Sequence, residues 1–186
     1  MLRELSRILA QLKGERFTGG LIAKAVWRRG DEGPEGLNVL RDRKTTVVAC
    51  ARIGDTTLTT TMLLGRLASP DASPTDVAAD LAKKSAEDAG AEGGARPWHT
   101  FTAEEIAAFV HDVNDVNVIH EGARPVVPGL ILLEELLDTP GYGDVSELSM
   151  RFMVPAFAGE PLTLAEDGSG GFTIRGDNAL ITGTRK

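Results

Sequence analysis

The sequence predicts an α+β protein in which strands of an antiparallel sheet wrap around a central apolar helix, in two successive halves. Three observations predict this class. Two segments carry apolar residues at helical spacing, several strand-like segments follow each of them, and a stretch rich in Ser, Pro, Ala and Gly separates the two sets. A helix that is apolar on most sides must be buried, and a curled antiparallel sheet can bury it.

The first half, residues 1–68, is predicted to begin with a helix over 1–13 that Gly14 ends, because Leu or Ile recurs at three- and four-residue steps. Strands are predicted in three segments: 18–29, 37–53 and 56–67. The last two are expected to form a hairpin about Gly54-Asp55, and the threonine-rich run after this turn favours a strand.

A linker is predicted over 69–97, with a weak helix over 75–89. The second half, residues 98–186, opens with Thr102 and Glu105 at the spacing of a capping box, followed by an amphipathic helix. A polar loop over 114–124 leads to a second, very apolar helix over 127–137. The remaining strands are predicted at 145–154, 160–166, 171–175 and 179–184.

Composition excludes several classes of function. The net charge of −7 argues against nucleic-acid binding. The one cysteine, Cys50, precludes a disulfide within the chain and is interpreted as a buried, inert thiol, which suits a cytoplasmic protein. No apolar stretch approaches the ~20 residues of a membrane span. Three dispersed histidines offer no metal-ligand spacing, so neither a metal nor a cofactor is expected. His99 and His111 are interpreted as surface or helix-packing residues.

The chemistry is predicted in the loop before the second apolar helix. Asp115, Asn117 and His120 put a carboxylate, a carboxamide and an imidazole within six residues, and Pro128-Gly129 then starts the helix. A helix start supplies unpaired N–H groups and the positive end of the helix dipole. This combination suits acid–base work on an acyl thioester, in which the Gly129 N–H polarises the carbonyl while Asp115 and His120 move protons.

The pattern Asp115-x-Asn117-x-Ile119-His120 resembles the signature of the MaoC-like hydratases. These hot-dog proteins add water to trans-2-enoyl thioesters or remove it from (R)-3-hydroxyacyl thioesters, with the Asp and the His as the catalytic pair. The chain departs from the family at Val118, where Pro is usual, and at Asn114, where Gly is common. Its loop from the His to the helix is also shorter.

The residues after His120 are similar to another hot-dog branch, the 3-hydroxyacyl-acyl-carrier-protein dehydratases of fatty-acid synthesis. The motif of that branch is a His, then Gly-Arg-Pro, then Pro-Gly, then a Glu on the helix. It corresponds without a gap to His120, Ala123-Arg124-Pro125, Pro128-Gly129 and Glu134, with Ala123 in place of the Gly. In that branch the catalytic pair is the His and the helix Glu, so His120 alone belongs to both pairs. The strand pattern over 148–163 is also similar to hot-dog proteins, and the resemblance extends over 100–186.

The resemblance implies a hot-dog fold, expected here as a double hot dog with a shortened, non-catalytic N-terminal repeat. It implies a hydro-lyase, a dehydratase or enoyl hydratase acting on acyl thioesters of CoA or acyl carrier protein in fatty acid metabolism, and a homodimer. The expected catalytic residues are Asp115 and His120, and the expected substrate-binding residues are Asn117, Arg124, Gly129 and Glu134. A thioesterase and a non-catalytic acyl-binding protein remain as alternatives. Asp115 and Asn117 could also merely stabilise the loop, and His120 could be structural.

Overall fold

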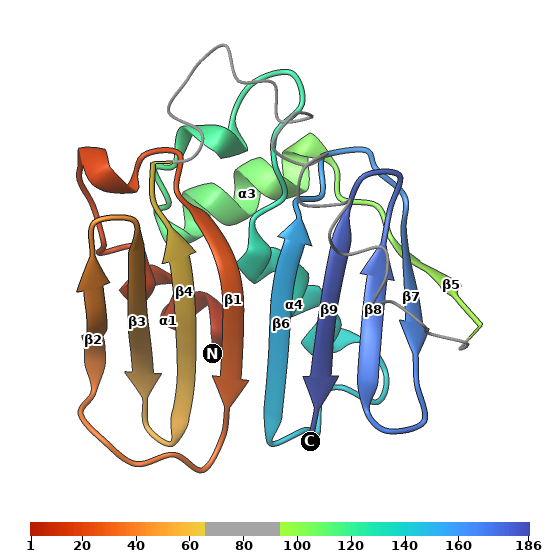
Figure 1. Cartoon of the computed structure of the whole chain (residues 1–186), viewed down its shortest axis with the longest axis horizontal. Coiled ribbons are helices and arrows are strands. Elements are labelled where there is room, and N and C mark those ends of the chain that lie inside the picture. Colours follow the sequence, from red (N-terminus) through yellow and green to blue (C-terminus); the bar gives the residue numbers. More distant parts are fainter. Residues whose placement is uncertain (66–93) are drawn as a thin grey trace.

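The computed structural model describes residues 1–65 and 94–186, which form a nine-stranded antiparallel sheet with the helices against one face (Figure 1). The elements of the first half are α1 (Leu2–Leu9), the 3-10 turn η1 (Glu15–Phe17), β1 (Leu21–Arg28), β2 (Gly36–Arg43), β3 (Thr46–Ile53) and β4 (Thr56–Leu63). Those of the second half are β5 (Arg96–His99), α3 (Ala103–Val113), the 3-10 turn η2 (Val118–His120), α4 (Gly129–Asp138), β6 (Glu147–Val154), β7 (Leu162–Glu166), β8 (Gly171–Arg175) and β9 (Leu180–Arg185).

The strand order is β2-β3-β4-β1-β6-β9-β8-β7-β5, so each half contributes one side of the sheet. Outward from the seam, the order β1-β4-β3-β2 in the first half matches the order β6-β9-β8-β7 in the second. At the seam β1 and β6 pair antiparallel, from Lys24 opposite Arg151 to Arg28 opposite Glu147. Among the described residues, the second half has a fifth strand, β5, at its outer edge, and the first half has none. The double hot dog stays a prediction, and so do the domain boundaries.

The first half contains the predicted elements with two changes. The helix is shorter than the predicted 1–13 and ends at Leu9, with Leu2, Leu5 and Leu9 buried. The single strand predicted over 37–53 is wrong, because a turn at Lys44-Thr45 divides it into β2 and β3. The predicted hairpin about Gly54-Asp55 is confirmed, with β3 and β4 as the two strands that pair on either side of this turn.

The second half confirms the capping box at the start of α3. The Glu105 N–H donates to Thr102 Oγ1 at 3.2 Å, and the Thr102 N–H donates to Glu105 Oε2 at 2.7 Å. The last two residues of the predicted linker, Arg96 and Pro97, belong to β5, which pairs with β7. Proline is tolerated there because β5 is an edge strand. The predicted helix over 75–89 lies outside the described residues.

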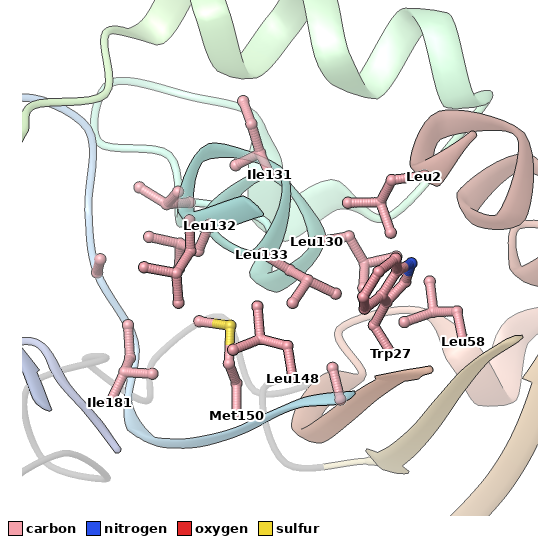
Figure 2. Packing of buried hydrophobic residues seen from close by; sticks show 14 of the residues in the cluster. Leu2, Trp27, Leu58, Leu130, Ile131, Leu132, Leu133, Leu148, Met150 and Ile181 are labelled. Atoms are coloured by element: carbon pink, nitrogen blue, oxygen red, sulfur yellow. The ribbon is translucent and has the colours of Figure 1, made fainter. Parts of the chain in front are cut away.

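The helix α4 is the centre of the core, as the sequence predicts. Its buried residues are Leu130, Ile131, Leu132, Leu133 and Leu136. Figure 2 shows the first four of these side chains above Leu148 and Met150 of β6, with Trp27 of β1 beside Leu130. Trp27 is 3% exposed and lies at the seam, so burial of α4 draws on strands from both halves.

Two smaller expectations concern chemistry and membranes. Cys50, expected to be buried, is half-buried on β3. Within 1–65 and 94–186, no helix has the length and apolar character needed to cross a bilayer.

Candidate active site

The loop after α3 is folded back tightly by its own backbone. Asn114 ends the helix in the left-handed conformation, with φ of 56°, which Asn tolerates better than most residues. The Asp115 N–H then donates to the carbonyl of Val110 at 3.0 Å. After the η2 turn, the Val126 N–H donates to the carbonyl of Ile119 at 2.9 Å. The loop therefore places Asp115 and His120 together, beside the start of α4.

The imidazole of His120 has a defined orientation and tautomer. Its side chain is 7% exposed. Nδ1 lies 2.8 Å from the carbonyl oxygen of Val126. A carbonyl can only accept, so Nδ1 carries a proton and donates it. In the neutral ring Nε2 is then an acceptor, and it lies 3.6 Å from Oδ2 of Asp115.

Burial lowers the pKa of His120 below its ordinary value of 6.5, because the apolar surroundings disfavour the charged ring. The Asp115 carboxylate and the hydrogen bond to Val126 raise the pKa, but by less than burial lowers it. The ring is therefore neutral at pH 7, and Nε2 is available as a base.

The two carboxylate oxygens of Asp115 face different ways. Oδ1 accepts a hydrogen bond from the N–H of Asn117 at 2.9 Å, which fixes the carboxylate, while Oδ2 is the atom beside His120. At 3.6 Å the contact between Oδ2 and Nε2 is too long for a hydrogen bond. Both atoms are acceptors, so a hydroxyl or water about 2.8 Å from each would donate to one or both.

Asn117 joins this loop to the first half of the chain. Its Oδ1 accepts from the N–H of Gly19 at 2.9 Å, and its Nδ2 donates to the carbonyl of Gly20 at 2.8 Å. Gly19 and Gly20 are buried and immediately precede β1. Both the oxygen and the nitrogen of the carboxamide are therefore hydrogen-bonded to backbone groups, 98 and 97 residues away in sequence.

The start of α4 lies at the same place. The N–H groups of Ile131 and Leu132 both donate to the carbonyl of Pro128, so those of Gly129 and Leu130 precede the helical ladder. Neither has a hydrogen-bond acceptor among the residues that the structure describes. A side chain at Gly129 would begin 3.0 Å from the Phe152 ring, so glycine allows that ring to approach the helix start.

Asp115, His120 and Gly129 line one cavity of about 290 Å³. Other lining residues come from the first half: Ser6, Leu9, Ala10, Leu12, Lys13, Gly14, Phe17, Thr18, Gly20, Leu21, Ile22, Thr60 and Met62. The second half adds apolar walls from α3, α4 and β6, namely Phe109, Val113, Leu130, Leu132 and Phe152. The cavity therefore lies between the halves and has room for roughly ten groups the size of a water or a methylene.

Two residues expected at the site lie elsewhere. Glu134 is not among the lining residues, because Arg3 of α1 binds its carboxylate through Nε at 2.9 and 3.0 Å. Arg124 is also outside the lining, and its guanidinium stacks over the ring of Phe157 at 4.5 Å.

The other two histidines are not part of the cavity. His99 lies between the carboxylates of Glu135 and Glu105, with Nδ1 3.2 Å from the first and Nε2 3.6 Å from the second. His111 is exposed on α3. No three His, Cys, Asp or Glu side chains of the described ranges are grouped as metal ligands.

Sequence reasoning missed every lining residue of the first half, which carries no recognisable site motif. Long-range packing brings them to the cavity: pairing of β1 with β6 sets β1 beside α4, and α1 packs against α3, β3 and β4. The buried hydroxyl-bearing residues Ser6 and Thr60 carried no signal by which they could have been found.

Comparison with known proteins supports the fold. No family model matches the chain, and no curated protein matches it in sequence. Among solved structures, it is similar to a MaoC-like dehydratase from Phytophthora capsici, with 12% identity, a TM-score of 0.53 and coverage of 94% of this chain and 72% of the other. It is also similar to a 12:0-ACP thioesterase from Umbellularia californica, with 10% identity, a TM-score of 0.53 and coverage of 92% and 76%.

A third similar structure is HtdX of Mycobacterium tuberculosis, with 14% identity, a TM-score of 0.50 and coverage of 98% of this chain and 81% of the other. Identities this low show the fold alone. With its large antiparallel sheet and buried apolar helix, the chain has the hot-dog fold.

Proposed function

We propose that this protein adds water to trans-2-enoyl thioesters, or removes it from (R)-3-hydroxyacyl thioesters. The observation that carries the proposal is the convergence of Asp115, His120 and the start of α4 on one cavity. The two side chains offer adjacent acceptors for a water, and the helix start offers N–H donors for a carbonyl oxygen. These are the groups that hydration of an enoyl thioester requires.

Each proton and electron pair of the proposed reaction can be traced through these residues. In the hydration direction, water bound between Asp115 Oδ2 and His120 Nε2 adds its oxygen to C3, and one of the two bases takes the released proton. The electron pair of the double bond moves toward the thioester carbonyl, whose oxygen gains negative charge and is stabilised by the Gly129 N–H and the helix dipole. The proton taken from water then passes to C2. Dehydration is the same sequence reversed.

The apolar part of the cavity would hold the acyl chain. Leu9, Met62 and Leu132 surround this space with aliphatic side chains, and its volume suits a chain of short or medium length. Asn117 acts indirectly in this scheme, because both sides of its carboxamide are occupied by backbone. It holds the loop that carries Asp115 and His120 against the first half.

The test is turnover of crotonyl-CoA, followed by the loss of enoyl absorbance. His120→Ala and Asp115→Asn are expected to lower kcat about 10²- to 10⁴-fold, the usual contribution of a general acid–base group. His111→Ala is the matched control, since His111 is an exposed histidine on α3 outside the cavity. Undiminished activity in His120→Ala would reject the proposal.

The products separate the alternatives. A free thiol released from an acyl-CoA would identify a thioesterase instead. Stabilisation of the fold by an acyl-CoA without any conversion would identify a non-catalytic acyl-binding protein.

A further inference from the structure

Lys13 has a distinctive position in the cavity lining. It is exposed, and it is the one lysine or arginine that the described part of the chain contributes to the lining. It forms no ion pair with any described residue. In a protein of net charge −7, an unpaired cation at a cavity is a site where an anion can bind.

The neighbouring cations are already engaged. Arg16, three residues further along, binds Asp42 through two nitrogens at 3.0 and 2.6 Å. Arg124, the cation expected from the sequence to bind an anionic carrier, stacks on Phe157 outside the lining. Lys13 is therefore better placed than either for contact with a ligand that occupies the cavity.

The lining has an inner and an outer end. Leu9, Thr60 and Leu132 are buried, whereas Lys13 and Val116 are exposed. An acyl thioester enters with its apolar chain toward the buried end, because burial of apolar surface is favourable there. Its carrier arm then leaves by the exposed end, past Lys13.

We infer that Lys13 binds the phosphate of the substrate's phosphopantetheine arm. This inference rests on the proposed function, because it requires a thioester in the cavity. The chemistry is an ammonium group meeting a phosphate at a partly solvated rim, for which lysine acts as a point charge. Both coenzyme A and a carrier protein supply such a phosphate, so the substrates tested must distinguish them.

The experiment compares crotonyl thioesters of CoA, of phosphopantetheine on a carrier protein, and of pantetheine without phosphate. Lys13→Ala is expected to raise KM about three- to tenfold for a phosphate-bearing substrate and to leave kcat unchanged. Lys13→Glu should raise KM further, through repulsion. The KM for crotonyl-pantetheine should not change in either variant.

Lys44→Ala is the matched control, because Lys44 is an exposed lysine in the turn between β2 and β3 that does not line the cavity. A larger effect with the CoA substrate than with the carrier-protein substrate identifies coenzyme A as the source of the phosphate, and the reverse identifies the carrier protein. An equal rise in KM for the phosphate-free thioester, or no rise for any substrate, overturns the inference.

A binding measurement keeps this inference separate from the proposed reaction. Calorimetric titration with coenzyme A needs no turnover. Weaker binding to Lys13→Ala than to Lys44→Ala would support the phosphate contact even if crotonyl-CoA were not hydrated. Equal binding to the two variants would refute it whatever the reaction.

Discussion

Replacement of Asn117 by Ala should cost stability, because its carboxamide holds two halves of the chain together. The substitution removes the bonds to the Gly19 N–H at 2.9 Å and to the Gly20 carbonyl at 2.8 Å. Both glycines are buried, so each backbone group loses a partner without free access to water. At about 1–2 kcal/mol for each unsatisfied group, the free energy of unfolding should fall by about 2–4 kcal/mol. This corresponds to roughly 5–15 °C in Tm for a chain of this size.

Urea unfolding followed by circular dichroism measures this loss. Asn38→Ala is the control, since Asn38 makes one exposed hydrogen bond, to the carbonyl of Pro34 at 3.2 Å, and should cost about 0.5 kcal/mol or less. A loss below about 0.5 kcal/mol in Asn117→Ala would refute the structural role. If activity also fell in that stable variant, Asn117 would contact the substrate directly.

Two further predictions concern His120 and the core. Because burial lowers the pKa of His120, activity should be constant above pH 6.5 and fall as the pH drops through that lowered value. Asp115→Asn removes a charge that raises this pKa, so in that variant the fall should move to lower pH; a shift to higher pH would contradict the assignment. On acidification, His120 of the unfolded chain is protonated before His120 of the folded chain, so the free energy of unfolding should also decline below pH 6.5. This decline should be smaller in His120→Gln, and acid titration of unfolding measures it. Leu133→Ala removes most of a side chain that is 0% exposed at the centre of the core. It should lower the free energy of unfolding, measured by urea denaturation, by about 2–5 kcal/mol, whereas a loss under about 1 kcal/mol would place Leu133 outside the core.

The sequence predicted the elements whose signals are local. The capping box at Thr102 needs only residues three apart, and the apolar character of α4 is visible in its own ten residues. The spacing of Asp115, His120 and Gly129 was likewise enough to indicate a loop that leads to a helix start. Each of these features is set by interactions within one or two turns of chain.

Features that depend on long-range pairing could not be predicted. The strand β5 contains Pro97 and follows a linker-like segment, and only its pairing with β7 makes it a strand. The partners of Asn117 are almost a hundred residues distant, and the cavity walls from the first half are set by the β1–β6 seam. Arg3 takes the carboxylate of Glu134, which a comparison of local motifs had placed in the site.

A double-variant cycle tests most directly the claim that Asp115 and His120 act together on one reacting group. The measurement is kcat/KM for crotonyl-CoA in Asp115→Ala, His120→Ala and the variant carrying both. Because Oδ2 and Nε2 lie 3.6 Å apart and share one water in this scheme, the combined variant should be about as slow as the slower single variant. Losses that multiply would show that the two side chains act independently, and full activity in either single variant would show that it does not take part in the reaction.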